Sequence, residues 1–164
     1  MTGRGKLAAL MSQLQFQIEL PRTKPTVALE SCADFFDRDY GTLLADVENR
    51  VIKFAWDIAT AGAGRREIRI YAASAWAFCY QKPMPDIKED DVYKIILPGR
   101  DIRSTELMRI LSCSHQHLYE LSRRSAAPGH FVVTREPAQA DGPNSFTVFS
   151  RDSIVKFLKS RRIS

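Results

Sequence analysis

The sequence has no long apolar segment. Among its 164 residues, no run approaches the roughly 18 consecutive apolar residues that a membrane-spanning helix requires. The basic first residues lead into a short apolar run and then a polar one, without the pattern of a cleavage site, so we expect no signal peptide. We therefore expect a soluble cytoplasmic protein that has no membrane partner.

Cysteine is scarce, and the three cysteines are not spaced as metal ligands are. Cys32, Cys79 and Cys113 form neither an even set nor a CxxC pair, and each lies in an apolar helical pattern. Buried free thiols in a reducing cytosol are therefore expected. His115 and His117 are two residues apart, which on a helix turns their side chains about 200° from one another. We therefore predict no metal site.

Catalytic motifs are also missing. The glycine-containing stretch at 61–66 lacks the strand-to-helix context and the lysine of a phosphate-binding loop. No nucleophile elbow occurs either. We expect neither enzymatic activity nor a cofactor.

The composition is that of a globular protein with a basic excess. Hydrophobic residues make up 45% and charged residues 26%, which favours a folded chain of one ordinary domain or two small ones. Lysine and arginine total 24 against 19 acidic residues, a net charge of +5. This excess favours an acidic partner such as nucleic acid.

The chain contains an internal repeat. The alternating run FQIELP at 16–21 returns as YKIILP at 93–98, and each predicts a strand that ends at proline. A helical stretch follows each run, at 29–36 and at 104–111, with apolar residues spaced by three and four. A second short helix comes next in both copies.

Each copy continues with a predicted β-hairpin and a closing helix. The hairpin strands are at 52–58 and 67–71 in the first copy, and at 130–134 and 145–149 in the second; the closing helices are at 74–81 and 152–160. The recurrence predicts an α+β fold of two tandem domains, each with a lead-in strand, a helix pair, a hairpin and a closing helix.

The prolines and charges after the first closing helix predict a linker. The domain bounds we predict are 1–14 for an N-terminal arm or helix, 15–82 for the first domain, 83–91 for the linker and 92–164 for the second domain. Residues 7–14 carry an apolar stripe, which fits core packing and a homodimer contact equally well.

The second helix pair has the layout of a helix-turn-helix. Ser114 is a good N-cap for its second helix. Leu118, Leu121 and Ser122 are predicted to face inward. The opposite side is polar and carries Gln116, Tyr119, Glu120 and Arg123, flanked by His117 and Arg124. Such a second helix is the one that enters the DNA major groove.

These residues resemble the excisionase-type helix-turn-helix of the MerR-like winged-helix superfamily. The matching positions are Leu107, Ile110, Leu111, Cys113, Ser114, Leu118, Tyr119 and Leu121, and FSRDSIVKFL at 149–158 resembles that family's closing helix. Ser112 and Ser125 replace two glycines of the pattern. The resemblance covers most of 104–160, and it implies that the hairpin is a wing that contacts the phosphate backbone or the minor groove.

The two copies differ in charge. Residues 29–53 hold six acidic and three basic side chains, a net of −3, whereas 103–135 hold five basic and two acidic ones, a net of +3. DNA phosphates would repel the acidic second helix of the first copy. We therefore expect this helix to bind the DNA major groove poorly. Arg65, Arg66 and Arg69 on its hairpin remain candidates for contact with the DNA backbone.

The sequence thus predicts a sequence-specific duplex-DNA-binding protein that regulates transcription by occupying an operator. The predicted contacts are His115, Gln116, His117, Tyr119, Glu120, Arg123, Arg124 and Arg135 in the second domain, with Arg65 and Arg66 in the first. Two alternatives remain open: an excisionase-like factor that bends DNA for recombination, and a protein-interaction module with degenerate helix-turn-helices. In the second alternative, the polar face of the second helix in the second copy would be a solvent-exposed surface that does not contact DNA.

Overall fold

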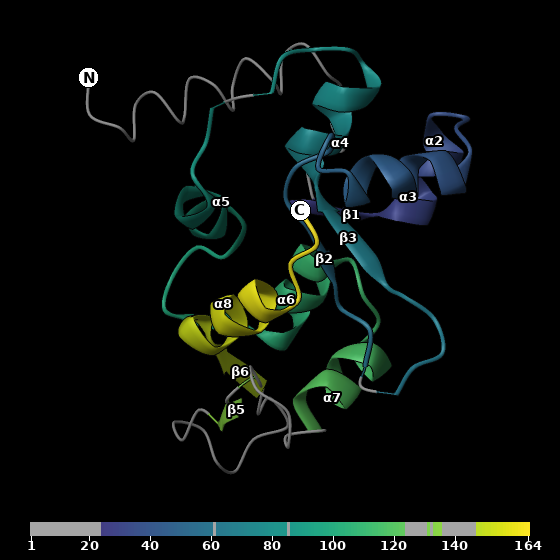
Figure 1. Cartoon of the computed structure of the whole chain (residues 1–164). Coiled ribbons are helices and arrows are strands. Elements are labelled where there is room, and N and C mark those ends of the chain that lie inside the picture. The colour runs from purple at the N-terminus through teal and green to yellow at the C-terminus, as the bar shows by residue number, and fades with distance from the viewer. Residues whose placement is uncertain (1–23, 61, 85, 124–130, 132, 136–146) are drawn as a thin grey trace, which may run out of the picture.

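The computed structural model describes residues 24–60, 62–84, 86–123, 131, 133–135 and 147–164. Within these residues, helices and two small antiparallel sheets form a mixed α+β fold (Figure 1). The predicted α+β class is confirmed. In this part of the chain no helix is both long enough and apolar enough to cross a membrane.

The first unit runs from β1 to α4. Its elements are β1 (Thr26–Ala28), α2 (Leu29–Phe35), α3 (Tyr40–Glu48), β2 (Ala55–Asp57), β3 (Ile68–Tyr71) and α4 (Ala72–Cys79). The strand order is β1-β3-β2, and Ile70 of the central strand pairs with Val27 on one side and Ala55 on the other. Ile70 is fully buried, so the sheet centre belongs to the core.

The second unit runs from β4 to α8 and has the same element order. Its elements are β4 (Asp101–Arg103), α6 (Ser104–Leu111), α7 (His115–Arg123), β5 (Val133–Arg135), β6 (Thr147–Ser150) and α8 (Arg151–Ser160). The strand order β4-β6-β5 matches that of the first unit, and the buried Phe149 takes the central place, paired with Ile102 and Val133. The predicted succession of strand, two helices, two strands and helix is therefore present in both units.

One predicted strand is wrong. The chain at 93–98 lies largely in helix α5 (Glu89–Ile96), in which Val92, Tyr93 and Ile96 are buried at helical spacing. Three acidic residues fill the first turn of α5, where they interact favourably with the helix dipole. A short apolar run fits strand and helix periods alike, so the flanking acids decide the outcome.

The lead-in strands therefore lie closer to their helices than predicted. β4 immediately precedes α6, and β1 immediately precedes α2. The strand predicted at 16–21 and the arm at 1–14 lie outside the described residues. Within the predicted linker at 83–91, the described residues before Glu89 have no regular structure, and α5 begins at Glu89.

The two units share one hydrophobic core. A single buried cluster includes Trp56 and Trp76 of the first unit together with Ile110, Leu118 and Phe157 of the second. A smaller cluster, which includes Leu43 and Val47, lies within the first unit under α2 and α3. Because apolar surface of both units is removed from water in the same cluster, each unit stabilises the other.

The chain after α8 also joins the units. Ile163 donates a backbone hydrogen bond of 2.8 Å to the carbonyl of Ala55, and the carbonyl of Ser164 accepts bonds from the amides of Phe54 and Ala55. The Ser164 hydroxyl donates to the carbonyl of Ile52 at 2.8 Å. The C-terminal residues thus extend the edge of the first unit's sheet at β2.

Candidate functional site

The turn between α6 and α7 is tight. Ser112 ends α6 in the left-handed region, with φ 48° and ψ 48°. This conformation costs a non-glycine residue about 1 kcal/mol. Ser112 also donates its hydroxyl to the carbonyl of Thr26 at 2.7 Å. A side chain that bonds to the first unit thus occupies a position where the resembled pattern has glycine.

Helix α7 begins with a side-chain cap. The Ser114 hydroxyl accepts a hydrogen bond of 3.1 Å from the amide of His117, and the Ser114 carbonyl accepts the first helical bond, from Leu118. The predicted N-cap is confirmed. Serine at this position satisfies one of the amide donors that every helix start leaves without an intrahelical partner.

The inner face of α7 consists of leucines. Leu118 is 2% exposed and Leu121 is 5% exposed, and both belong to the core that contains Leu107 and Ile110 of α6. The predicted inward orientation of both leucines is confirmed. Ser122 is half-buried and donates its hydroxyl back to the carbonyl of Tyr119.

The outer face of α7 is polar and open to solvent. His115, Gln116, Tyr119 and Arg123 are exposed. The Arg123 guanidinium lies 5.3 Å from the centre of the Tyr119 ring, a cation–π geometry, and has no ion-pair partner among the described residues. The Gln116 amide donates a hydrogen bond of 3.1 Å to the carboxylate of the half-buried Glu120, so these two side chains are bonded to each other.

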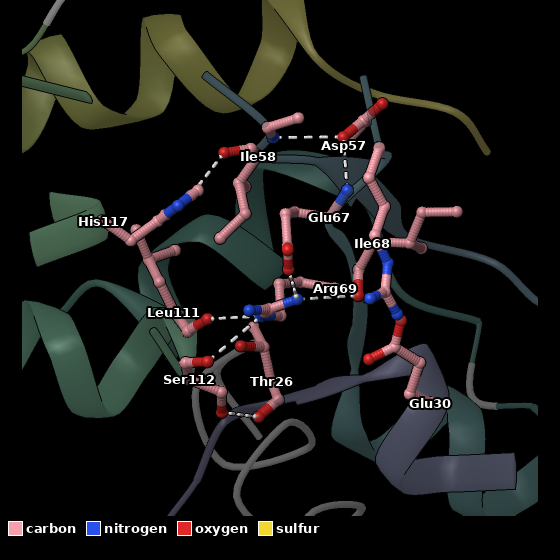
Figure 2. A network of polar contacts seen from close by, with 12 residues as sticks. Thr26, Glu30, Asp57, Ile58, Glu67, Ile68, Arg69, Leu111, Ser112 and His117 are labelled. Atoms are coloured by element: carbon pink, nitrogen blue, oxygen red, sulfur yellow. Dashed lines mark hydrogen bonds and ion pairs between the residues drawn. The ribbon is translucent and has the colours of Figure 1, made fainter. Parts of the chain in front are cut away.

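His117 is occupied within the protein. Its Nε2 lies 2.7 Å from the carbonyl oxygen of Ile58, at the end of β2 in the first unit. A carbonyl oxygen only accepts, so this nitrogen carries the proton. The predicted flanking DNA contact is therefore a half-buried link between α7 and the first unit (Figure 2).

The basic side chains of the first unit's hairpin are also engaged. Arg65 pairs with Glu30 of α2, and Arg66 pairs with Glu48 at 2.6 Å and with Asp57 at 3.5 Å. Both arginines are exposed, yet acids from the same unit surround them. Acidic residues of α2, α3 and β2 thus balance the charge of the two hairpin arginines.

Arg69 was predicted to be available to the DNA backbone, and this is wrong. It is 7% exposed, and its Nε donates to the carbonyl oxygens of Leu111 at 2.8 Å and Ser112 at 3.2 Å. Its Nη1 reaches Glu67 at 3.3 Å. Figure 2 shows this guanidinium at the end of α6, where it caps carbonyl groups that lack helical partners.

Two predicted contacts lie beyond what the structure describes. Arg124 is outside the described residues. Arg135 is placed by its backbone, in β5 opposite Thr147, but its side chain is outside the description. Neither residue therefore enters the geometry of the site.

Cys32 and Cys79 form a thiol pair that the spacing of the sequence did not indicate. A hydrogen bond between them raises the pKa of Cys32, and the same bond lowers the pKa of Cys79. Burial raises the pKa of Cys113 to about 11. Cys32 lies in α2 and Cys79 ends α4, so the pair arises from packing of the two helices.

Comparison with protein-family models, with curated proteins and with solved structures gives no match to this chain. Within the described part of the chain, no three histidine, cysteine or acidic side chains gather as a metal site would require.

Proposed function

We propose that this protein binds duplex DNA sequence-specifically and regulates transcription by occupying an operator. In this proposal the two units are tandem winged helix-turn-helix domains, and α7 is the helix that enters the major groove. The observation that carries the proposal is the outer face of α7. It exposes Gln116, Tyr119 and Arg123 above a buried leucine face, on a helix that starts directly after a tight turn.

The side chains of α7 suit the two kinds of contact that DNA requires. The amide of Gln116 can pair with the N6 and N7 edge of adenine once it releases Glu120, which gives base readout. Arg123 has no ion-pair partner in the described chain, so its guanidinium can bind a DNA phosphate or the edge of a guanine. The hairpin of β5 and β6 acts as the wing.

The first unit has a supporting role in this proposal. Its hairpin arginines are already paired with Glu30, Glu48 and Asp57, so a phosphate must compete with these acids for them. Arg69 and His117 instead connect the first unit to α6 and α7. The first unit therefore holds the reading helix in a fixed orientation.

Selection from a random pool of duplex DNA, followed by affinity measurements against salt concentration, tests the proposal. We expect enrichment of a defined sequence, and a log–log plot of affinity against salt that falls linearly as counterions are released. An unenriched pool combined with binding that salt does not weaken would refute the proposal. Binding of the selected site should also exceed binding of random duplex by about a thousandfold or more.

The paired hairpin arginines favour a second candidate function. If the helix-turn-helix surfaces do not bind nucleic acid, the acidic first unit and the basic second unit fit a protein-interaction module. A third reading, an excisionase-like factor that bends DNA for recombination, uses the same α7 contact. Electrophoresis of circularly permuted fragments separates this reading from simple operator occupancy, because only a bend makes mobility depend on the position of the site.

A further inference from the structure

A pocket lies where the first unit meets the turn before α7. Its volume is about 330 Å³, within the range of small-molecule sites. Val27, Ala28, Phe35 and Ala75 line it from β1, α2 and α4, and Ser112 lines it from the second unit. The first unit therefore forms most of the pocket, and Ser112 brings the second unit to its edge.

One of the residues that line the pocket contains a buried polar group without a partner. Trp76 lines the pocket and is 4% exposed, and its indole N–H has no hydrogen-bond acceptor among the described residues. A buried donor without an acceptor costs about 1–3 kcal/mol. The nitrogen itself is almost fully covered, so a ligand atom that accepts a hydrogen bond reaches it only if the indole ring shifts.

The charged side chain at the pocket indicates the charge of the ligand that fits it. Lys24 is exposed and is the one charged side chain among the described residues that line the pocket. The Ser31 hydroxyl is a further polar group of the lining, whereas the Ser112 hydroxyl is already donated to the carbonyl of Thr26. A cation without an acid beside it favours an anion at the polar end of the ligand.

The aromatic side chains of the lining indicate which apolar group of a ligand fits the pocket. Phe35 is 63% exposed although it is a large apolar residue, and its ring meets the ring of Trp76 edge-on at 5.0 Å between centroids. Edge-to-face and offset contacts are the geometries that a further flat ring can extend. The apolar walls and these two rings therefore fit a ligand of one or two aromatic rings.

We propose that this pocket binds a small aromatic monocarboxylate, with its rings against Phe35 and Trp76 and its carboxylate toward Lys24. Ser112 lines the pocket, so the ligand also contacts the turn that leads into α7. The binding site does not depend on whether α7 binds DNA.

The test uses the two tryptophans of the 164-residue chain as probe and control. Trp56 donates its indole N–H to the Tyr93 hydroxyl at 3.1 Å, so its partner is already in place. On titration with 1-naphthoate, ¹H–¹⁵N spectra should show saturable movement of the Trp76 indole resonance. The Trp56 resonance should stay in place, and the backbone amide of Ser112 should move with Trp76.

Two variants and a neutral ligand test the charge assignment. Lys24→Gln should weaken naphthoate binding about fivefold, since an exposed charge pair contributes about 1 kcal/mol. The same variant should bind 1-naphthamide as the wild type does, and Lys53→Gln, which removes an exposed lysine that does not line the pocket, should leave naphthoate binding unchanged. Because Lys24 and Lys53 are exposed, both variants are expected to fold.

Three results would overturn the proposal. The first is the absence of saturable binding by naphthoate. The second is equal binding of naphthoate and naphthamide, or equal binding of naphthoate by wild type and Lys24→Gln, which removes the role of the cation. The third is movement of the Trp56 resonance while that of Trp76 stays still, which places the ligand elsewhere. Loss of DNA binding affects none of these measurements, so the two proposals fail independently.

Discussion

Arg69 in the central strand of the first unit donates a 2.8 Å hydrogen bond from its Nε to the carbonyl oxygen of Leu111, the last residue of α6 in the second unit. The side chain is buried, and its other bonds reach Ser112, Glu67 and the carbonyl of Ile68. A guanidinium therefore caps a helix that begins 35 residues further along the chain. Thr26 adds to the polar connection between the units, because its hydroxyl donates to the carbonyl of Ile110. Its own carbonyl accepts from the Ser112 hydroxyl, as Figure 2 shows.

Replacement of Arg69 by methionine should destabilise the whole described fold. The change leaves the carbonyls of Leu111 and Ser112 without their donor, and we expect a loss of about 2–4 kcal/mol in the free energy of unfolding. Urea unfolding followed by tryptophan fluorescence and by far-UV circular dichroism measures it. Because the units share one core, both probes should report a single transition in the wild type.

Arg66→Met is the matched control for this prediction. It removes an arginine from the same hairpin, but Arg66 is exposed and pairs with Glu48 and Asp57 at the surface. Its loss should cost less than about 1 kcal/mol. Equal losses for the two variants would contradict the view that Arg69 connects the units.

The periodic elements could be predicted from the sequence because local patterns determine them. Helices α6 and α8 follow apolar spacing of three and four, and Ser114 is a recognisable cap for α7. The inner face of α7 followed from the same spacing. The polar character of its outer face could also be predicted. The hydrogen bond between Gln116 and Glu120 could not.

The contacts between the units could not be predicted, because each joins residues far apart in the chain. An arginine at an alternating strand position has no local feature that distinguishes a buried helix cap from a solvent-facing side chain, and Arg69 was assigned the wrong role for this reason. The pairing of Ser164 with Phe54 and the bond from His117 to Ile58 likewise depend on tertiary packing. At 93–98 the run was too short for its period to decide between strand and helix.

Truncation of the inner face of α7 should be far more costly than truncation of its outer face. Leu118→Ala removes a side chain that is 2% exposed, and it should lower the free energy of unfolding by about 2–5 kcal/mol. Gln116→Ala alters an exposed side chain and should change it by less than about 0.5 kcal/mol. Thermal and urea melts of both variants measure the difference. Similar losses would mean that α7 is oriented differently from the structure.

Cys79 and Cys113 should react with iodoacetamide in a defined order. Thiolate is the nucleophile, and the hydrogen bond from Cys32 lowers the pKa of the half-buried Cys79, so Cys79 should be alkylated first near neutral pH. Burial raises the pKa of Cys113 to about 11, so its reaction should accelerate as the pH rises toward that value. Mass spectrometry of peptides taken at successive times gives the order.

A cysteine variant tests the cause of that order. Cys32→Ala removes the hydrogen bond to Cys79, so the pKa of Cys79 should rise and its alkylation at neutral pH should slow. The rate for Cys113 should not change. Earlier alkylation of Cys113 than of Cys79 in the wild type would contradict the assignment.

The proposed DNA interface predicts that one arginine of α7 contributes more to binding than a hairpin arginine of equal charge. Arg123 is exposed and has no ion-pair partner in the described chain, whereas Arg65 is paired with Glu30. Arg123→Gln should therefore reduce the slope of log affinity against log salt by about one unit, the effect of one lost phosphate contact. Arg65→Gln should reduce it much less, because a phosphate gains little from a guanidinium whose charge is already balanced.

Affinity against salt for each variant, on a selected site and on random duplex, measures these slopes. Lys156→Gln, on the exposed side of α8, removes one positive charge away from α7 and controls for the net charge of the protein. Gln116→Ala should lower the preference for the selected site and leave the slope unchanged, because a base contact releases no counterion. If Arg65→Gln instead reduces the slope as much as Arg123→Gln does, the Arg65–Glu30 pair must open on DNA. The hairpin of the first unit would then be part of the interface.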